Sequence, residues 1–558
     1  MRRNFFGKKA WLALSAASLS VFAAGCASTG AGKNAASSLA PVARAASGAN
    51  EGVYYSLFVR SFADSDGDGI GDFNGITAKL DYLNDGDDST TSDLGITGIW
   101  LLPIFPSQSY HGYDVDDYFD VNPQYGTMAD FENMLRECKK RGISVIIDMT
   151  FNHSSTYTEW FKDSKNPDDP HRSYYRWITA DDKRYNINQD MWGHRVWNED
   201  KSHPGNYYAG LFGNHMPDFN LDSPELRDEF KRVVKFWLDK GVSGFRFDAA
   251  GHVYNSAKSP AGANSTGKAV AWWKEIVDYA HSVNPGAYCV GEVWEPNSIR
   301  AQYIAGLGSD FHFDMGNRIV DTLKDGDDGN NAYANGLEGD YKRLAQSNPD
   351  YIDAPFLSNH DQARAAGLLR GNAEMCKAAA SMYMLAEGIP FVYYGEEIGM
   401  RSGTDDPSKR TPMLWNKTWE DNGKPVDKKQ TTWASSRYNA KTLPVSVQTR
   451  DPDSLLQFYK RIIRLKTAHP ALFAGRFSAV AVGTPNISSW QMKSDAETAL
   501  VMVNVTSSPL DVEIPEAYSG FDVAFASDEK SGAPSITADG KTRFSIPAYG
   551  TLVLSKTE

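Results

Sequence analysis

Carboxylate and imidazole side chains follow several short apolar runs of the sequence, at the C-terminal end of each run. Asp148 to His153 end one run, Asp248 to His252 follow another, and Glu292 and Asn359 to Asp361 follow two more. A single Asp in such a place is more often the N-cap of the next helix than a reactive group. N-capping is a poor explanation when three separate apolar runs each end beside a carboxylate and their ends lie at the same edge of the fold. Carboxylates gathered in this way can act as nucleophile, acid and base, so we expect an active site there.

The apolar runs have the length and composition of buried strands, and helical stretches such as 128–141, 225–240 and 269–283 lie between several of them. Strands that alternate with helices predict a parallel sheet, and eight strands predict a closed (β/α)8 barrel. In such barrels the active site lies at the C-terminal ends of the strands. The expected strands are Val53–Val59, Ile96–Ile104, Ile143–Met149, Gly244–Phe247, Ala287–Val293, Phe311–Met315, Ala354–Leu357 and Pro390–Tyr394.

Two regions do not follow the barrel pattern. Residues 151–217 separate the third and fourth expected strands and contain 13 aromatic side chains, which predicts an inserted subdomain at the C-terminal rim. After a helical stretch at 454–466 the pattern changes to short strands with turn signals, which predicts an antiparallel β-sandwich over 474–558. The α/β barrel itself is therefore expected to comprise residues 51–150 and 218–473.

The motifs at the strand ends resemble, in order, the signature regions of the α-amylase family, glycoside hydrolase family thirteen. Met216–Asn220 resembles a further region of that family, with Phe219 where Leu is usual. The similarity covers roughly residues 51–475, and the C-terminal sandwich corresponds to the family's usual companion domain. The segments that carry it are Tyr110–Asp114, Asp148–His153, Gly244–His252, Gly291–Trp294, Phe356–Asp361, Pro390–Met400 and Asp453–Leu472.

The resemblance implies a retaining glycosidase with two catalytic carboxylates. Asp248 would be the nucleophile, Glu292 the general acid/base, and Asp361 the residue that stabilises the distorted transition state. Retention requires the first two carboxyls to lie about 5–5.5 Å apart, and the acid must stay protonated above the ordinary pKa of a Glu. Arg246, two residues before Asp248 on the same strand, faces the same side and would hold that carboxylate ionised.

The resemblance also implies contacts with the sugar. His153 and His360 match histidines that bind hydroxyls at the point of cleavage, and Tyr113 matches an aromatic ring that stacks beneath that sugar. His252 matches too, but Gly251 stands where many α-amylases have Lys, so one contact on the leaving side is expected to be missing. As an alternative, each of these side chains could be an ordinary residue of the barrel rim.

The residue after the nucleophile borders the point of cleavage. In the family, Val at this position accompanies action on α-1,6 bonds, whereas Ala249 indicates α-1,4 bonds in starch-type glucans and maltooligosaccharides. The same fold could instead serve an exo-acting α-glucosidase, an oligo-1,6-glucosidase or a 4-α-glucanotransferase. A third alternative is a non-catalytic glucan-binding surface protein. Such relatives usually lack part of the carboxylate set, and here all three carboxylates are present.

A calcium site is expected at the loop from Asp64 to Asp72. The carboxylates of Asp64, Asp66, Asp68 and Asp72 alternate with glycines and, with the carbonyl of Ile70, could surround a hard cation. The loop is not an EF-hand, because its twelfth position is Gly75 where a Glu would be needed. The alternative is a solvated acidic turn, and members of the family carry this loop as a calcium site. By the same resemblance, Asn152 matches a ligand of a second calcium ion.

The N-terminus has the features of an export signal. Arg2, Arg3, Lys8 and Lys9 precede a mostly apolar run, Ala10–Ala24, which is too short to span a bilayer. Its end resembles a bacterial lipobox, so residues 1–25 are expected to be removed and Cys26 to carry the lipid. Residues 26–50, rich in Ala, Ser and Gly, would form a flexible tether. The protein is thus expected to be exported and lipid-anchored to the cell envelope. Ordinary signal cleavage is the alternative.

Composition narrows the partners further. The formal net charge of −13, with no basic cluster, argues against a nucleic-acid partner. Cys138, Cys289 and Cys376 have no CxxC spacing and are expected to be buried free thiols. We expect a monomer whose partners are its glucan substrate and, through Cys26, a membrane.

Overall fold

The computed structural model describes residues 44, 48–416, 430–528, 532–537 and 540–558. The expected signal peptide, Cys26 and most of the tether lie outside these residues. In the part of the chain that the structure describes, no helix is long and apolar enough to cross a membrane.

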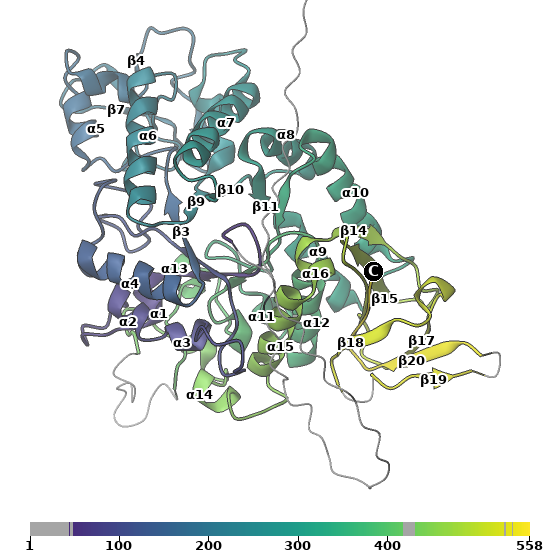
Figure 1. The fold of residues 1–558 in the computed structure, drawn as a ribbon. Helices are drawn as coiled ribbons and strands as arrows, with labels where there is room; N and C mark the ends of the chain where they lie inside the picture. The colour runs from purple at the N-terminus through teal and green to yellow at the C-terminus, as the bar shows by residue number, and fades with distance from the viewer. Residues whose placement is uncertain (1–43, 45–47, 417–429, 529–531, 538–539) are drawn as a thin grey trace, which may run out of the picture. The chain divides into compact units, whose positions relative to one another are not determined.

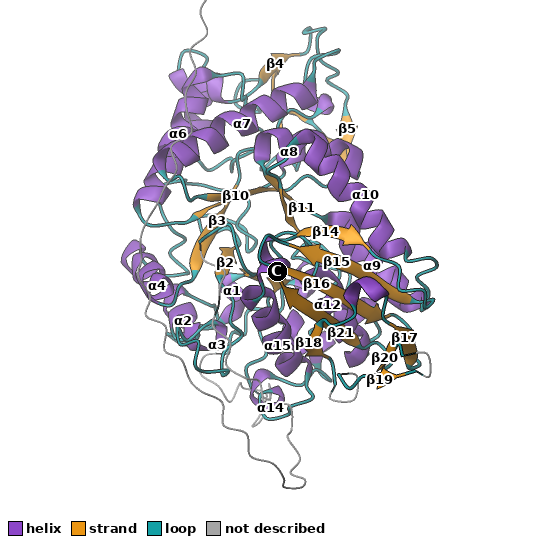
Figure 2. Cartoon of the chain, turned by 45° about the vertical axis from the view of Figure 1, so that its right-hand side comes forward, coloured by secondary structure: helices purple, strands orange, loops and turns teal. Residues whose placement is uncertain are grey.

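Eight parallel strands form the sheet at the centre of the chain (Figures 1 and 2). Their order is β12-β11-β10-β9-β3-β2-β1-β13, and the sheet closes beyond β12, where the N–H of Phe391 donates to the carbonyl of Pro355 at 2.9 Å. The predicted barrel is confirmed. The strands are β1 (Tyr54–Leu57), β2 (Gly98–Leu101), β3 (Ser144–Met149), β9 (Gly244–Phe247), β10 (Tyr288–Gly291), β11 (Ser309–Phe311), β12 (Ile352–Ala354) and β13 (Phe391–Tyr393).

Two of the expected strands are displaced. Strand β11 comprises Ser309–Phe311 rather than Phe311–Met315, and β12 ends at Ala354 where the prediction placed its start. Both strands carry a buried carboxylate, Asp310 and Asp353, which a search for apolar runs passes over. The guanidinium of Arg300 pairs with both carboxylates, so these strands can be polar and still lie inside the fold.

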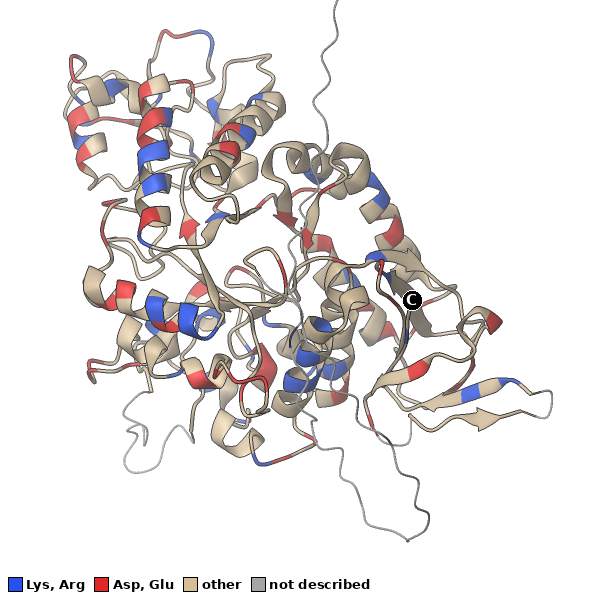
Figure 3. Cartoon of the chain, in the orientation of Figure 1, with Lys and Arg blue, Asp and Glu red and all other residues tan. Residues whose placement is uncertain are grey.

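Helices surround the strands (Figure 2). Their ends carry the expected capping residues: Thr127 forms a capping box with Asp130 at α4, and Ser223 caps α6, which begins at Pro224. Figure 3 shows acidic and basic residues interspersed along α6. The longer helices are α4 (Met128–Lys140), α6 (Pro224–Asp239), α7 (Ser265–Val283), α8 (Asn297–Leu307), α9 (Phe313–Asp325), α10 (Ala332–Ser347), α12 (Ala373–Met384) and α15 (Leu455–Ala468).

Shorter helices lie in the connections. They are α1 (Val59–Phe62), α2 (Phe73–Thr77), α3 (Leu80–Leu83), α5 (Glu159–Ser164), α11 (Ala365–Leu368), α13 (Asp406–Lys409), α14 (Val445–Gln448) and α16 (Pro470–Ala474).

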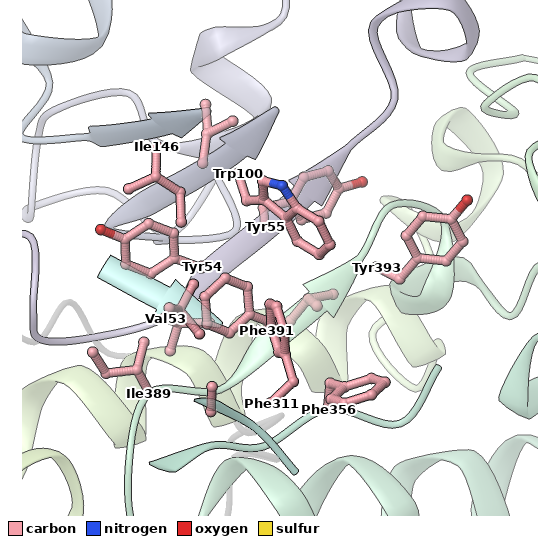
Figure 4. Close-up of a cluster of buried hydrophobic side chains, with 14 of the residues drawn as sticks. Val53, Tyr54, Tyr55, Trp100, Ile146, Phe311, Phe356, Ile389, Phe391 and Tyr393 are labelled. Atoms are coloured by element: carbon pink, nitrogen blue, oxygen red, sulfur yellow. The ribbon is translucent and has the colours of Figure 1, made fainter. Parts of the chain in front are cut away.

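Aromatic rings fill the interior of the barrel (Figure 4). Tyr54 stacks on Phe391 with ring centroids 5.1 Å apart, and Trp100 lies 5.2 Å from Phe311. Gly98 makes room for this packing, because a Cβ there would lie 2.5 Å from the ring of Tyr54. Fully burying one such side chain stabilises the fold by roughly 1.5–3 kcal/mol, so this layer fixes the strand positions on which the site depends.

Residues between β3 and β9 form small sheets of their own. Strands β4 (Trp177–Thr179), β8 (Asn206–Ala209) and β7 (Trp197–Glu199) pair antiparallel, and β5 (Asp190–Met191) pairs with β6 (His194–Arg195) in a hairpin. Ile178, Val196, Trp197, Ala209 and Leu211 form a separate small core. The aromatic-rich segment therefore folds around its own apolar cluster.

The C-terminal part contains two antiparallel sheets around a second apolar cluster. One sheet has the order β14-β15-β16-β21-β18 and the other β17-β20-β19. Cys138, Cys289 and Cys376 are buried free thiols, as predicted. The strands are β14 (Arg476–Ala479), β15 (Ile487–Lys493), β16 (Glu497–Asn504), β17 (Leu510–Glu513), β18 (Asp522–Ala526), β19 (Ser535–Ile536), β20 (Thr542–Ile546) and β21 (Thr551–Thr557).

Candidate active site

One cavity of about 660 Å³ opens at the C-terminal ends of the barrel strands. Asp248 follows β9, Glu292 follows β10 and Asp361 follows β12, and all three line this cavity. The structure thus brings together the three carboxylates predicted to be catalytic. Tyr113, His153 and His252 line the same cavity.

The guanidinium of Arg246 lies at the centre of the carboxylates. Its Nη1 contacts Asp248 Oδ1 at 2.7 Å and Asp148 Oδ1 at 2.7 Å, and its Nη2 contacts Glu292 Oε2 at 2.9 Å. Arg246 and Asp148 are fully buried. Charge-assisted contacts to a rigid planar group fix both the position and the orientation of the carboxylates. The sequence predicted the contact with Asp248 but not those with Asp148 and Glu292.

Burial and nearby charges set the protonation states of Asp248 and Glu292. Burial raises the pKa of Glu292, the nearby charge of Arg246 lowers it, and the carboxylates of Asp248 and Asp361 raise it further. Burial also raises the pKa of Asp248, where Arg246 acts in the opposite direction through charge and a direct hydrogen bond. Arg246 reaches Asp248 and Glu292 with one nitrogen each, but two further carboxylates raise the pKa of Glu292, whereas the hydrogen bond from Arg246 lowers that of Asp248. The arrangement therefore favours a proton on Glu292 and a charge on Asp248.

Asp361 stays ionised. His360 Nε2 lies 3.0 Å from its Oδ2, and Arg410 Nη2 donates to its Oδ1 at 2.8 Å. These two partners hold the pKa of Asp361 far below its usual range, against the effect of burial. No sequence pattern pointed to Arg410, because it directly follows the short helix α13 in the long connection after β13.

Tyr113 and His153 line the cavity, whereas the Nε2 of His360 is already in contact with Asp361 and the Tyr113 hydroxyl. The Tyr113 hydroxyl donates to Asp148 Oδ2 at 3.0 Å, and its ring stacks on His360 at 5.5 Å. His153 is buried, and burial lowers its pKa to about 4, so its ring is neutral. The amide of Asn152 donates to His153 Nδ1 at 3.1 Å, which places the proton on Nε2. Nε2 is buried and has no hydrogen-bond partner among the described residues, and other atoms of the residue line the cavity.

Aromatic side chains line the cavity beyond Glu292. Trp294 and Trp192 are 51% and 59% exposed, which is unusual for Trp, and both line the cavity. Trp294 stacks on Phe313 at 4.6 Å, whereas Trp192, in the β5–β6 hairpin, lies 5.4 Å from the ring of His252. Exposed rigid rings suit stacking on sugar faces. Composition alone does not separate aromatic residues of the core from rings that face a ligand.

The backbone after Asp248 also contributes to the site. Ala249 has a left-handed conformation with φ of 47°, which is uncommon for any residue but Gly, Asn or Asp. In this conformation its N–H donates to Glu292 Oε2 at 2.9 Å. Because Arg246 contacts the same oxygen, Oε1 is left for the proton and the substrate.

The Asp64–Asp72 loop brings three carboxylates close together. Oxygens of Asp64, Asp66 and Asp72 lie within 4.8 Å of one another, while Asp68 Oδ1 accepts the N–H of Ile70 at 2.7 Å. In the described part of the chain, none of these carboxylates pairs with Lys or Arg. Burial and the charges of Asp68 and Asp66 raise the pKa of Asp64, partly offset by two backbone N–H donors. Hard oxygen donors with excess negative charge fit a hard divalent cation.

Asn152 does not fit its predicted role as a ligand of a second calcium ion. Its Oδ1 accepts a hydrogen bond from Lys258 Nζ at 2.7 Å, and the same ammonium lies 3.5 Å from Asp218 Oδ1. The oxygen predicted to bind calcium therefore faces an ammonium group of the chain. The sequence could not reveal this, because Lys258 lies more than a hundred positions after Asn152 in an irregular segment.

Comparison with known proteins agrees with this geometry. A sequence model described as the α-amylase catalytic domain matches residues 56–475. The chain belongs to the α-amylase family. It is 38% identical to α-amylase 3 of Dictyoglomus thermophilum over 456 residues, which cover 81% of this chain and 84% of that protein. It is 32% identical to a 4-alpha-glucanotransferase of Thermotoga maritima, over 72% of this chain and 84% of that protein.

Solved structures show the same architecture. The α-amylase from H. orenii superimposes with a TM-score of 0.82 at 36% sequence identity, covering 91% of this chain and 99% of that one. The barrel of this α-amylase family member and its C-terminal sheets are thus shared with an enzyme of that name. The chain is an enzyme of the glycoside hydrolase and transferase type that this family comprises.

Proposed function

We propose that this family member is a retaining hydrolase that cleaves α-1,4-glucosidic bonds in starch-type glucans and maltooligosaccharides. The observation that carries the proposal is the contact of one guanidinium, that of Arg246, with both Asp248 and Glu292. Carboxyls that share one guanidinium are held close together, which favours the ~5–5.5 Å spacing of retaining enzymes over the wider spacing of inverting ones. The similarity to an α-amylase over most of both chains supports the substrate class.

The geometry suggests how the reaction proceeds. Asp248 Oδ1 binds Arg246, so its other oxygen would attack the anomeric carbon. Glu292 would donate its proton to the glycosidic oxygen as that bond breaks, which leaves a covalent glycosyl-enzyme. Glu292, now ionised, would take a proton from water, and that water would release the sugar with its original configuration. The Asp361 charge would stabilise the oxocarbenium-like transition states.

An exo-acting enzyme is the second candidate, and one contact favours it. On the Asp361 side of the cavity the hydroxyl of Tyr110 donates to Asp406 Oδ2 at 3.2 Å, which joins two loops of the rim. Such a bridge would limit the length of chain that can pass. Under this alternative, Asp406→Ala would increase the activity on long starch chains relative to that on maltotriose.

Product analysis tests the proposal. Hydrolysis of maltopentaose, followed by NMR of the anomeric protons, should show the α-anomer forming first. Digestion of starch should give a range of maltooligosaccharides. Initial release of the β-anomer would contradict retention, and glucose alone from the first minutes would favour the exo-acting alternative. Transfer to added maltose in place of hydrolysis would favour a 4-α-glucanotransferase.

We also propose that the Asp64–Asp72 loop binds one calcium ion in a structural role. Asp64, Asp66 and Asp72, whose carboxylate oxygens converge, would bind the ion, and Asp68 and the carbonyl of Ile70 would complete the ligand set. The loop follows β1 and contributes no side chain to the active-site cavity.

From residues 1–26 we propose that the protein is exported and anchored by a lipid at Cys26. Detergent-phase partitioning of the wild-type protein, lost in Cys26→Ser, would support a lipid anchor. Equal partitioning of both proteins into the aqueous phase would support ordinary signal cleavage. Size-exclusion chromatography of the Cys26→Ser protein should show a monomer.

A further inference from the structure

A single buried ammonium group lies where three parts of the active-site surroundings meet. Lys258 ends the short helix Ser256–Lys258 in the segment after β9, and only 3% of its surface is exposed. Its Nζ donates to Asn152 Oδ1, in the segment after β3, at 2.7 Å. It also lies 3.5 Å from Asp218 Oδ1, at the end of the inserted segment. Asn152 and Asp218 are themselves 1% exposed.

Asp218 connects this cation to the inserted segment. Its Oδ2 accepts the N–H of Leu211 at 2.8 Å, and its Oδ1 accepts the amide of Asn152 at 2.9 Å. The backbones on either side are bonded too: the N–H of Phe219 donates to the carbonyl of Asn152 at 2.9 Å, and that of Ser154 to Pro217 at 3.1 Å. A buried Asp in such a network needs a positive partner, because an uncompensated charge is costly in the interior.

An ammonium group and a metal ion make different demands on this place. Calcium takes six to eight oxygens at about 2.3–2.6 Å, whereas Lys needs only a few acceptors at hydrogen-bond distance. Here the oxygen of Asn152 serves Lys258, and its amide nitrogen, which cannot ligate a cation, faces the Asp218 carboxylate. This donor set suits the ammonium and not a second metal ion.

We infer that Lys258 is a positioning residue that acts as an internal cation, joining the inserted segment to the barrel so that this junction requires no metal ion. Asn152 transmits its effect to the site, since the amide that Lys258 orients also donates to His153 Nδ1. The same segment carries His252, whose ring lies 3.2 Å from the amide of Asn255, three residues before Lys258. Lys258 is thus linked to His153 through Asn152 and lies in the same segment as His252, and both histidines line the cavity.

Amide hydrogen exchange tests this inference without assuming any activity. The reporters are the N–H groups of Ser154, Leu211 and Phe219. In the wild-type protein, excess EDTA should leave their exchange unchanged. In Lys258→Met, which keeps most of the side-chain length and removes the charge, exchange should be at least tenfold faster. Lys258→Arg, which keeps the charge, should stay within about threefold of the wild-type rate.

Enzyme kinetics provide a second test of the inference, and this test rests on the proposed hydrolase function. Lys258→Met should lower kcat/KM on maltopentaose about tenfold or more, with most of the loss recovered in Lys258→Arg. Lys268→Ala is the matched control, because Lys268 lies nearby but its side chain is 46% exposed and pairs with Asp222. It should change neither exchange nor kinetics.

Two results would overturn the inference. Faster exchange in EDTA that is confined to these reporters, and not shared by the N–H groups of the barrel strands, would show that a metal ion, not Lys258, holds the junction. Wild-type exchange in a folded Lys258→Met protein would show that the ammonium is dispensable. If Lys258→Met does not fold, the wild-type protein in EDTA and the Lys258→Arg variant still test the inference. Fast exchange in the Lys258→Arg protein would contradict it. Inactivity of the wild-type protein on maltooligosaccharides would contradict the proposed function alone.

Discussion

Two groups of carboxylates in this enzyme are built in opposite ways. Around Arg246, the carboxylates of Asp148, Asp248 and Glu292 are buried and share one guanidinium supplied by the chain. In the Asp64–Asp72 loop the carboxylates converge with no cationic side chain among the described residues. The first group is therefore fixed by the fold, whereas the charge of the second must be balanced from solution. Reactivity is expected to depend on the first group and metal-linked stability on the second.

Neutralising either member of the catalytic pair gives the largest expected effect. Asp248→Asn or Glu292→Gln should lower kcat on maltopentaose by ~10²–10⁴-fold or more, because no other group can take either role. The melting temperature should stay the same or rise, since fewer carboxylates then compete for Arg246. A folded variant that retains more than a few percent of wild-type turnover would contradict the assignment.

Removing the shared cation should affect stability as well as activity. Arg246→Met would leave several buried carboxylates without a partner and is expected to cost about 3–5 kcal/mol of unfolding free energy. Urea denaturation measures this cost. Arg232→Met is the control: its side chain is 72% exposed and pairs with Glu229, so the loss should be ~1 kcal/mol or less. Equal losses in the two variants would show that the central cation has no special importance.

The pH dependence should report the raised pKa of Glu292. Burial and the charges of Asp248 and Asp361 raise this pKa, and catalysis needs the protonated form. Activity should therefore persist well above the ordinary pKa of Glu (~4.3) and fall about tenfold per pH unit once the pH exceeds the raised value. Loss of kcat/KM already between pH 4 and 5 would contradict a protonated acid at this position.

Calcium should alter stability through the loop alone. At a hundredfold excess over Kd, a bound ion stabilises the folded state by about 2.7 kcal/mol, which is visible as a higher melting temperature in calcium than in EDTA. Asp64→Asn combined with Asp66→Asn should abolish this shift and leave kcat nearly unchanged. A melting temperature that does not respond to calcium or chelator would show that the loop is a solvated acidic turn and not a calcium site.

Adding a further cation to the active-site cavity should give the smallest effect. A Cβ at Gly251 would meet Val293 only at ordinary contact distances of 3.6 Å and more, so Gly251→Lys can be accommodated. One new substrate contact is worth ~1–2 kcal/mol, or about tenfold in kcat/KM on maltotriose. Both proteins should prefer maltotriose to isomaltotriose. Equal or better cleavage of isomaltotriose by the wild-type enzyme would favour an oligo-1,6-glucosidase.

The sequence was informative where chemistry and periodicity coincide. Asp248, Glu292 and Asp361 could be found because each follows an apolar run, and the barrel fixes where such runs end. Arg410, Lys258 and Trp192 could not be found, because their positions depend on irregular segments folded back from distant parts of the chain. Strand β11 was misplaced since its buried Asp310 is compatible with the interior only through Arg300, a contact that no local pattern records.

The left-handed turn at Ala249 has a consequence for altering bond preference by mutagenesis. A left-handed backbone costs an ordinary residue roughly 1–2 kcal/mol, and a β-branched side chain tolerates it worst. Ala249→Val would thus strain the main chain before its bulk could meet a sugar, and any relaxation would move the N–H that Glu292 accepts. Ala249→Gly and Ala249→Asn would keep the turn. Variant libraries at this position will be filtered first by backbone conformation and only then by the shape of the substrate.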